Sequence, residues 1–281
     1  MSINEKLETY LQEILSKIRE GKVVLFLGAG ASRAAGGPLA KTLTEMIKKK
    51  FSKIDQSLTE FIDVCQDVID TPSYHRNQLE EFIKSQLDSL RPTQAHEIMT
   101  KYDWAAIFTT NFDDLIELAY RLTPGRIKNP QPIYSEKFQV NPADRSKIYI
   151  FKIMGSIAAL ESETGTMVLS RSDYTRALRR RKGYIRILSD FVKNGTILFI
   201  GYSFGDRFIL DIIDEIIEEY GIDRLPWSYA LFDQLELDEK TNYKFMRRKI
   251  IPLKCSFEEF LNIWTKIMKS LPKLLNLSAL N

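Results

Sequence analysis

The clearest hydrophobic pattern along the chain is an unbroken run of five apolar residues, 23–27, that ends at Gly28. A run of this length bounded by glycine is typical of a strand buried on both faces, as in a parallel sheet. Comparable runs recur later in the chain, and most of them lead into small or polar residues. They predict further strands at 104–108, 147–153, 167–169, 196–200, 227–232 and 250–253.

Between these runs, apolar residues recur at the spacing of amphipathic helices, opposite charged residues. The predicted helices are 3–20, 38–50, 57–70, 76–90, one that starts at Pro92, 115–121, two that follow Ser170, 206–220, 239–249 and 257–271. Strands that alternate with helices over this length predict an α/β fold, with a doubly wound, mostly parallel, Rossmann-like sheet.

Two segments depart from this alternation. Several helices follow one another between the first two predicted strands, and we interpret them as a small helical lobe inserted over 38–101. This lobe would belong to a single domain that spans 1–281, a length that one domain with helical additions can reach. The segment 124–146 is rich in Pro and Asn and is expected to be irregular.

Small and polar residues follow four of the predicted strands. They form the segments 28–32, 109–114, 154–156 and 201–206. Because parallel strands end at the same edge of a sheet, we expect these segments to line one pocket. A strand that empties into a glycine turn before a helix can hold a pyrophosphate on its backbone N–H groups. Glycines also serve such turns for steric reasons alone, and Arg33 stands where dinucleotide folds usually have a third glycine.

Composition and charge mainly exclude classes of protein. The chain is 44% hydrophobic and 27% charged with a formal net charge of +3, which gives no general case for nucleic acid or membrane binding. Cys65 and Cys255 have no companions at metal-ligand spacing, so we expect no cysteine-based zinc site. A charged N-terminus and the lack of a long apolar run favour a cytoplasmic protein.

Three of the strand-end segments occur in the order seen in sirtuin-like domains. They read Gly-Ala-Gly-Ala-Ser at 28–32, Thr-Thr-Asn-Phe-Asp at 109–113 and Gly-Tyr-Ser-Phe-Gly-Asp at 201–206, and His96 after an alanine fits the same pattern. Their form resembles that of bacterial antiphage effectors, as in Thoeris or the sirtuin-Argonaute and sirtuin-HerA systems. The resemblance covers about residues 20–235. It implies a Rossmann-like NAD-binding fold that cleaves NAD, as its substrate, to nicotinamide and ADP-ribose without zinc.

The same resemblance implies a role for each matched residue. Asn111 would contact the ribose beside the scissile bond and position water, and Asp113 would orient that loop. The residues expected to hold the pyrophosphate are Gly28, Ala29, Gly30 and Ser32, and those expected to border the adenosine are Gly201, Ser203 and Phe204. Thr110, within the second motif, and Gly155, in the segment 154–156, complete the expected binding residues. Cleavage of the ribose C–N bond passes through an oxocarbenium-like state, which nearby amide and carboxylate groups can stabilise.

One catalytic position departs from the family pattern. The family usually has histidine before the glycine of a Lys-x-His-Gly strand end, whereas here Lys152 and Ile153 are followed by Met154. A thioether is not a useful proton acceptor at neutral pH. General acid–base help typically supplies about 100- to 10,000-fold in rate, so its loss slows a reaction without necessarily abolishing it.

Three interpretations of Met154 remain open. The chain hydrolyses NAD with Asn111 and Asp113, or it is a variant inactivated at position 154, or it is a nucleotide-binding scaffold subunit. A Rossmann-type domain for another nucleotide is a less specific fourth reading. Effectors that the chain resembles work as assemblies, which implies a homo-oligomer or a complex with a sensor such as an Argonaute-like or HerA-like protein.

Overall fold

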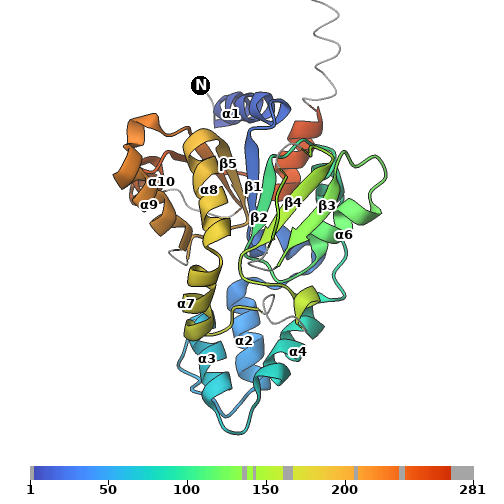
Figure 1. Cartoon of the computed structure of the whole chain (residues 1–281), viewed down its shortest axis with the longest axis vertical. Helices are drawn as coiled ribbons and strands as arrows, with labels where there is room; N and C mark the ends of the chain where they lie inside the picture. Colours follow the sequence, from blue (N-terminus) through green and yellow to red (C-terminus); the bar gives the residue numbers. More distant parts are fainter. Residues whose placement is uncertain are drawn as a thin grey trace, which may run out of the picture.

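A seven-stranded parallel sheet organises the computed structural model, which describes residues 3–134, 138–141, 144–160, 167–205, 208–233 and 238–266. The strand order is β3-β4-β2-β1-β5-β6-β7, and every neighbouring pair is parallel (Figure 1). The strands are β1 (Val23–Leu27), β2 (Ala106–Thr109), β3 (Asn129–Ile133), β4 (Lys147–Lys152), β5 (Thr196–Ile200), β6 (Ser228–Phe232) and β7 (Ile250–Lys254). The predicted α/β, Rossmann-like fold class is confirmed.

The first strand lies at the centre of the sheet, which explains its unbroken apolar run. All five residues of β1 are buried, and Leu25 pairs in register with Ile107 of β2 and Leu198 of β5. A strand with neighbours on both sides and helices on both faces has no polar face to present. The chain adds β2, β4 and β3 on one side of β1 and then crosses to β5, β6 and β7. This reversal is the topological switch point, where open α/β sheets bind ligands.

Helices cover both faces of the sheet, and each face has its own core. One core joins α1 (Ile3–Arg19), α5 (Gln94–Met99), α6 (Leu115–Leu122) and a helix over 257–266 to the sheet, and the other joins α8 (Lys182–Asn194), α9 (Phe208–Tyr220) and α10 (Glu239–Met246). Alternate residues of β1 enter the two cores, Leu25 on the first face and Phe26 on the second. In the described ranges, no helix has the length and apolar character that crossing a membrane requires.

A third core lies beyond the carboxyl ends of the strands (Figure 1). It is formed mainly by α2 (Ala40–Lys50), α3 (Phe61–Asp70) and α4 (Arg76–Leu87), which lie between β1 and β2 in sequence. The helix α7 (Arg171–Arg180) is tied to this lobe, because Arg76 of α4 donates to Asp173 at 2.6 Å and Arg171 lies 2.6 Å from Asp63 of α3. The helical lobe therefore borders the same sheet edge as the strand-end segments.

Two sequence expectations about strands were wrong. Residues 167–169 are described but form no strand; Met167 and Leu169 are apolar because they fill the core of the helical lobe. The segment 124–146 was expected to be irregular, yet it contains the edge strand β3, whose Pro130 and Pro132 disguised it. A strand at a sheet edge tolerates proline where the missing N–H would face away from its neighbour.

The prolines of both outer strands satisfy that condition. The N–H of Asn129 donates to the Ser146 carbonyl beside β4, so the alternating residues Pro130 and Pro132 face outward. At the other edge, the N–H of Cys255 donates to the Phe232 carbonyl beside β6, and the same alternation turns Pro252 outward. Within the described ranges, three short 3₁₀ helices complete the fold: η1 (Ala29–Ala35), η2 (Ile157–Ala159) and η3 (Ile222–Arg224).

Candidate active site

The loops that follow β1 and β5 cross each other in direct backbone contact. The Gly28 N–H donates to the Ile200 carbonyl at 3.0 Å, and the Gly30 N–H donates to the Gly201 carbonyl at 2.9 Å. A Cβ atom on Gly28 would lie 2.6 Å from the Tyr202 Cα, and one on Gly30 would lie 2.7 Å from the Gly201 Cα. These glycines therefore permit the approach of a second loop, the steric role that the sequence left open.

The crossing uses two amides that had been assigned to a ligand. Because the N–H groups of Gly28 and Gly30 already donate within the protein, a phosphate held here would draw on other donors of the same turn. That Gly28, Ala29, Gly30 and Ser32 hold a pyrophosphate stays a prediction.

Asn111 lies in a buried hydrogen-bond network beside this crossing. Its Nδ2 donates to the Gly28 carbonyl at 3.1 Å and to Ser32 Oγ at 3.0 Å, and Ser32 Oγ donates in turn to Asp113 Oδ2 at 2.8 Å. A carbonyl can only accept, so the Gly28 contact identifies the amide nitrogen and fixes the orientation of the carboxamide. The network joins the loops after β1 and β2.

The other end of the Asn111 carboxamide is unpaired. Asn111 is 7% exposed, and among the described residues its Oδ1 has no hydrogen-bond partner. A buried acceptor without a donor is costly, and native proteins satisfy nearly all such groups. Oδ1 is therefore the atom of this network that retains an unused acceptor position.

Asp113 orients the loop rather than presenting a free carboxylate. It is 4% exposed, its Oδ1 accepts the Leu115 N–H at 3.1 Å, and its Oδ2 accepts the Ser32 hydroxyl. The carboxylate thus caps the first turn of α6 and holds the β1 loop at the same time. That Asp113 orients this loop for a bound NAD stays a prediction.

His96 is a buried neutral group behind this network. Its Nδ1 accepts the Thr93 N–H at 3.2 Å in a capping box at the start of α5, and its ring packs edge-on against Phe257. Burial lowers the pKa of His96 to about 4, and the negative charge of Asp113 opposes that effect. A histidine in this state serves packing and capping.

The buried histidine predicts a pH dependence of stability. The folded state takes up the proton less readily than the unfolded state, so stability is full above pH 6.5 and falls as the pH drops toward 4. The loss amounts to at most about 3 kcal/mol. His96→Gln keeps a capping acceptor that does not titrate. Urea unfolding at pH 7 and pH 4.5 should show a smaller pH-dependent loss for His96→Gln than for the unmodified chain; equal losses would contradict the assignment.

Met154 follows β4 at the same sheet edge, but its side chain packs toward α7 and α8. It lines a small apolar pocket with Tyr174, Arg181 and Tyr184, whose free volume of about 10 Å³ is barely that of a single water. A guanidinium nitrogen of Arg181 donates to the Ile153 carbonyl, directly before Met154. The Met154 side chain therefore packs against the core on this face of the sheet, at the position where the family resemblance implied an imidazole.

The remaining predicted residues lie in the same strand-end loops. Thr110 donates its N–H to the Leu27 carbonyl at 3.3 Å, and Gly155 has a positive φ of 88°. Ser203 is exposed and its Oγ accepts the Gly205 N–H at 3.2 Å. Phe204 is buried in an aromatic cluster with Phe199, Tyr202 and Phe245. Residue 206, the end of the third motif, lies outside the described residues.

The structure thus brings one group of predicted residues into direct contact. Hydrogen bonds or backbone contacts connect Gly28, Gly30, Ser32, Asn111, Asp113 and Gly201. Ser203 and Phe204 share a loop with Gly201, and Met154 faces the helices α7 and α8 instead.

Sequence reasoning missed a buried charged pair behind the Asn111 loop. Lys152, the last residue of β4, is fully buried, and its Nζ lies 3.2 Å from Glu117 Oε1 on α6. The signal was a lysine that closes an otherwise apolar strand directly before its polar exit. Lysine and glutamate are rarely buried unless they are paired.

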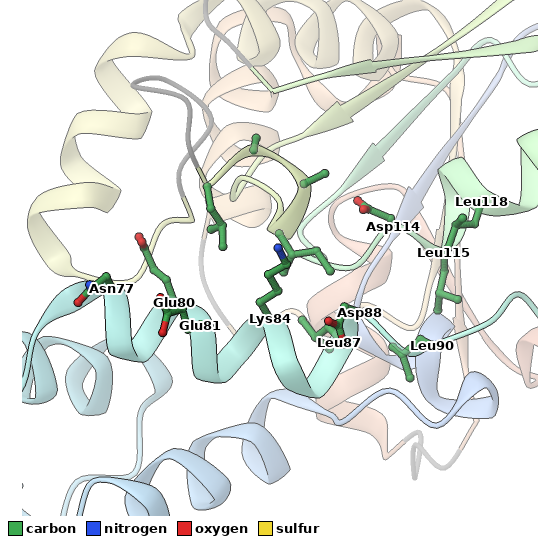
Figure 2. Close-up of a pocket in the computed structure, with 14 residues that line it drawn as sticks. Asn77, Glu80, Glu81, Lys84, Leu87, Asp88, Leu90, Asp114, Leu115 and Leu118 are labelled. Carbon is green, nitrogen blue, oxygen red and sulfur yellow. The ribbon is translucent and has the colours of Figure 1, made fainter.

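A cleft of about 900 Å³ lies beside the same loop, between α4, η2 and the start of α6 (Figure 2). Asp114 is the residue of the 109–114 segment that lines it, and its Oδ1 accepts the Ser156 hydroxyl at 3.0 Å. Figure 2 shows Glu80, Glu81 and Lys84 on α4, across the cleft from Asp114. Nowhere in the described ranges do three His, Cys, Asp or Glu side chains gather as a metal site requires.

Comparison with known proteins places this site in a family context. The profile of the SIR2-like domain family matches residues 105–253. The chain is 24% identical over 251 residues to "NAD(+) hydrolase ThsA" of Acinetobacter baumannii and 23% identical over 250 residues to the protein of that name from Bacillus cereus. These alignments cover 86% and 85% of this chain but 49% and 50% of the relatives, so the chain spans about half of their length.

A third relative and a solved structure agree with this relationship. "Defense-associated sirtuin 2" of Bacillus subtilis is 25% identical over 202 residues, which cover 70% of this chain and 19% of that protein. The structure of Sir2Tm bound to a propionylated peptide superposes with a TM-score of 0.51 and 13% identity, covering 92% of this chain and 98% of that one. The latter likeness concerns the fold. Because the family profile matches more than half of the residues, the chain belongs to the SIR2-like domain family.

Proposed function

We propose that this chain binds NAD and hydrolyses it to nicotinamide and ADP-ribose. The observation that carries the proposal is the unpaired, buried Oδ1 of Asn111 at the switch point of a parallel sheet. The names of two relatives that align with more than four fifths of the chain support the same reaction. NAD is the substrate in this proposal, and no metal takes part in it.

Hydrolysis of NAD requires the protein mainly to position the substrate and water and to stabilise developing charge. When the ribose C1′–N bond breaks, the nitrogen keeps the electron pair, so nicotinamide leaves as a neutral molecule and needs no proton. The ribose carries the developing positive charge, which the negative end of the Asn111 carbonyl dipole stabilises. Water then forms the C1′–O bond and releases a proton to solvent. Oδ1 can accept a hydrogen bond from that water and so orient it.

A specific observation favours a second candidate function, a nucleotide-binding scaffold with impaired catalysis. Position 154 holds a packed thioether, and both oxygens of Asp113 are engaged, so neither supplies a general base. In this alternative the chain binds NAD or a related nucleotide but turns it over slowly. The two candidates share the binding site and differ in rate.

Placing a histidine at position 154 distinguishes the active hydrolase from the scaffold with impaired catalysis. Met154→Leu keeps an apolar side chain of similar volume and is the control, whereas Met154→His supplies an imidazole just after β4, at the sheet edge where the Asn111 loop follows the neighbouring strand β2. If the missing base limits the rate, we expect Met154→His to raise nicotinamide release by about 100-fold or more. The rate of nicotinamide release from NAD is measured by chromatography of the reaction mixture. A fast unmodified chain that gains nothing from the substitution would remove the scaffold alternative.

The proposed reaction has a direct test on the unmodified chain. Incubation with NAD should yield equal amounts of nicotinamide and ADP-ribose, and calorimetry should show that NAD binds more tightly than ATP. Binding of NAD without any product, in every oligomeric state tested, would leave the scaffold function. Absence of both binding and product would overturn the NAD-binding proposal and favour a different nucleotide.

We further propose that this activity serves prokaryotic antiphage defence. The name "Defense-associated sirtuin 2" of one relative supports this role. The chain spans about half the length of the hydrolase relatives, so it does not by itself define how such a defence protein assembles. The assembly partners are therefore part of the same proposal. We propose that the protein acts in the cytoplasm, either as a homo-oligomer or in a complex with a sensor such as an Argonaute-like or HerA-like protein.

A further inference from the structure

The buried pair of Lys152 and Glu117 lies directly behind the loop that carries Asn111. Lys152 ends β4 and pairs in register with Thr109, the last residue of β2. Its Nζ lies 3.2 Å from Glu117 Oε1 and also donates to the main-chain carbonyl of Asp113. The ammonium therefore connects the end of one strand to the loop that leaves its neighbour.

Burying this ion pair costs desolvation free energy, so the pair contributes little net stability to the fold. Neither Glu117 oxygen accepts a hydrogen bond of good geometry among the described residues, and burial raises the pKa of Glu117 while the Lys152 ammonium opposes that rise. Desolvation of two such charges often outweighs their attraction, so apolar residues of similar volume can be equally stabilising. A neutral side chain with an N–H or O–H group could also donate a hydrogen bond to the Asp113 carbonyl. Stability alone therefore gives no reason for a lysine here.

Hydrogen bonds on either side of Asp113, one to its main chain and one to its side chain, connect this ammonium to the Asn111 carboxamide. Lys152 holds the Asp113 carbonyl, the Asp113 carboxylate accepts the Ser32 hydroxyl, and Ser32 accepts the Asn111 amide. Other bonds pin the same loop: the Asn111 N–H donates to Thr109 Oγ1 at 3.0 Å, and the Phe112 carbonyl accepts the Ile157 N–H at 3.0 Å. Lys152 is the cationic member of this set.

We propose that Lys152 is a positioning residue, which acts through Asp113 and Ser32 to hold the Asn111 carboxamide in its reactive orientation, and that Glu117 compensates its charge. The inference rests on the proposed NAD hydrolysis and adds to it a residue that never touches the substrate. A displacement of about 1 Å at a reacting group can cost about 100-fold in rate. Loss of this hold should therefore lower kcat more than it changes KM.

The decisive comparison is between Lys152→Met and the double variant Lys152→Met with Glu117→Met. The single variant leaves a buried carboxylate unpaired and should unfold at a lower temperature, whereas the double variant removes both charges and should recover the midpoint. Both should keep a kcat for NAD hydrolysis about 10- to 100-fold below that of the unmodified chain, with KM changed less than threefold. Lys147→Met, the same change at the exposed start of β4, should leave both constants unaltered.

Recovery of stability without recovery of kcat is the result expected of a positioning residue. If the double variant regains both, or if folded Lys152→Met keeps full kcat, the proposal is overturned. An inactive unmodified chain would instead count against the proposed function, and a second readout covers that case. The side-chain NH₂ signals of Asn111 in ¹⁵N spectra, assigned with Asn111→Asp, should shift and exchange faster in the double variant. Unchanged signals would overturn the positioning role without reference to activity.

Discussion

Replacing Asn111 by alanine is expected to lower kcat for nicotinamide release by about 100- to 1,000-fold. The substitution removes the buried Oδ1, the dipole that would face the positive charge on the ribose, and a single preorganised group of this kind typically contributes that much. Two hydrogen bonds to Gly28 and Ser32 are lost with it, at about 1 kcal/mol each, so the variant should still fold. Steady-state kinetics with NAD, combined with a thermal melt, measures both effects.

The chain offers a matched control for this change at the opposite edge of the sheet. Asn194 precedes β5, and its Nδ2 donates to the Asp190 carbonyl within the same helix. Asn194→Ala should keep the full kcat and KM. If Asn111→Ala retained a third or more of the activity, the carboxamide would have no part in the chemistry.

Replacing Gly201 by alanine is expected to lower the free energy of unfolding by about 4 kcal/mol or more, an exceptional loss for one methyl group. A Cβ there would lie 2.2 Å from the Ala31 nitrogen and 2.5 Å from the Gly30 carbonyl carbon, both of them backbone atoms. Neither can move unless the loops after β1 and β5 separate. The positive φ of 64° adds the ordinary cost of a left-handed non-glycine residue, about 1–2 kcal/mol.

Gly125→Ala separates the two contributions. Gly125 has a similar φ of 73° but no atom within 4 Å of its would-be Cβ, so alanine there should cost about 1 kcal/mol. Urea unfolding of both variants gives the difference, which measures the loop crossing itself. Equal losses for Gly201→Ala and Gly125→Ala would show that the crossing yields easily.

The sequence predicted the fold, and it brought the candidate site residues to one sheet edge, because both inferences depend on local patterns. An apolar run such as 23–27 has few stable places other than the middle of a covered sheet, and the polar segments at strand ends meet once the strands are parallel. Asn111 could therefore be assigned to the switch-point edge without coordinates. The unpaired state of its Oδ1 could not be predicted. The carboxamide is oriented by hydrogen bonds from Nδ2 to Gly28 and Ser32, which lie about 80 residues away in the sequence.

The features that sequence reasoning missed arise from contacts between distant segments. Glycine at 28 and 30 has the same appearance whether a ligand or another loop approaches, and only the placement of Gly201 decides between them. Lys152 and Glu117 look like ordinary surface charges until β4 and α6 are packed together. The apolar run 167–169 resembles a strand because a lobe core and a sheet core select the same residue types.

The prolines on the two outer strands have a consequence for how copies of this chain can associate. Because Pro130, Pro132 and Pro252 offer no N–H at the free borders of the sheet, a strand from another molecule would find a broken row of donors there. Intermolecular strand pairing, a common route to aggregation, is thus disfavoured at both ends. Side chains on helices and loops are then the favoured contacts for an assembly of these chains, and such an interface could change without disturbing the sheet that carries the candidate site.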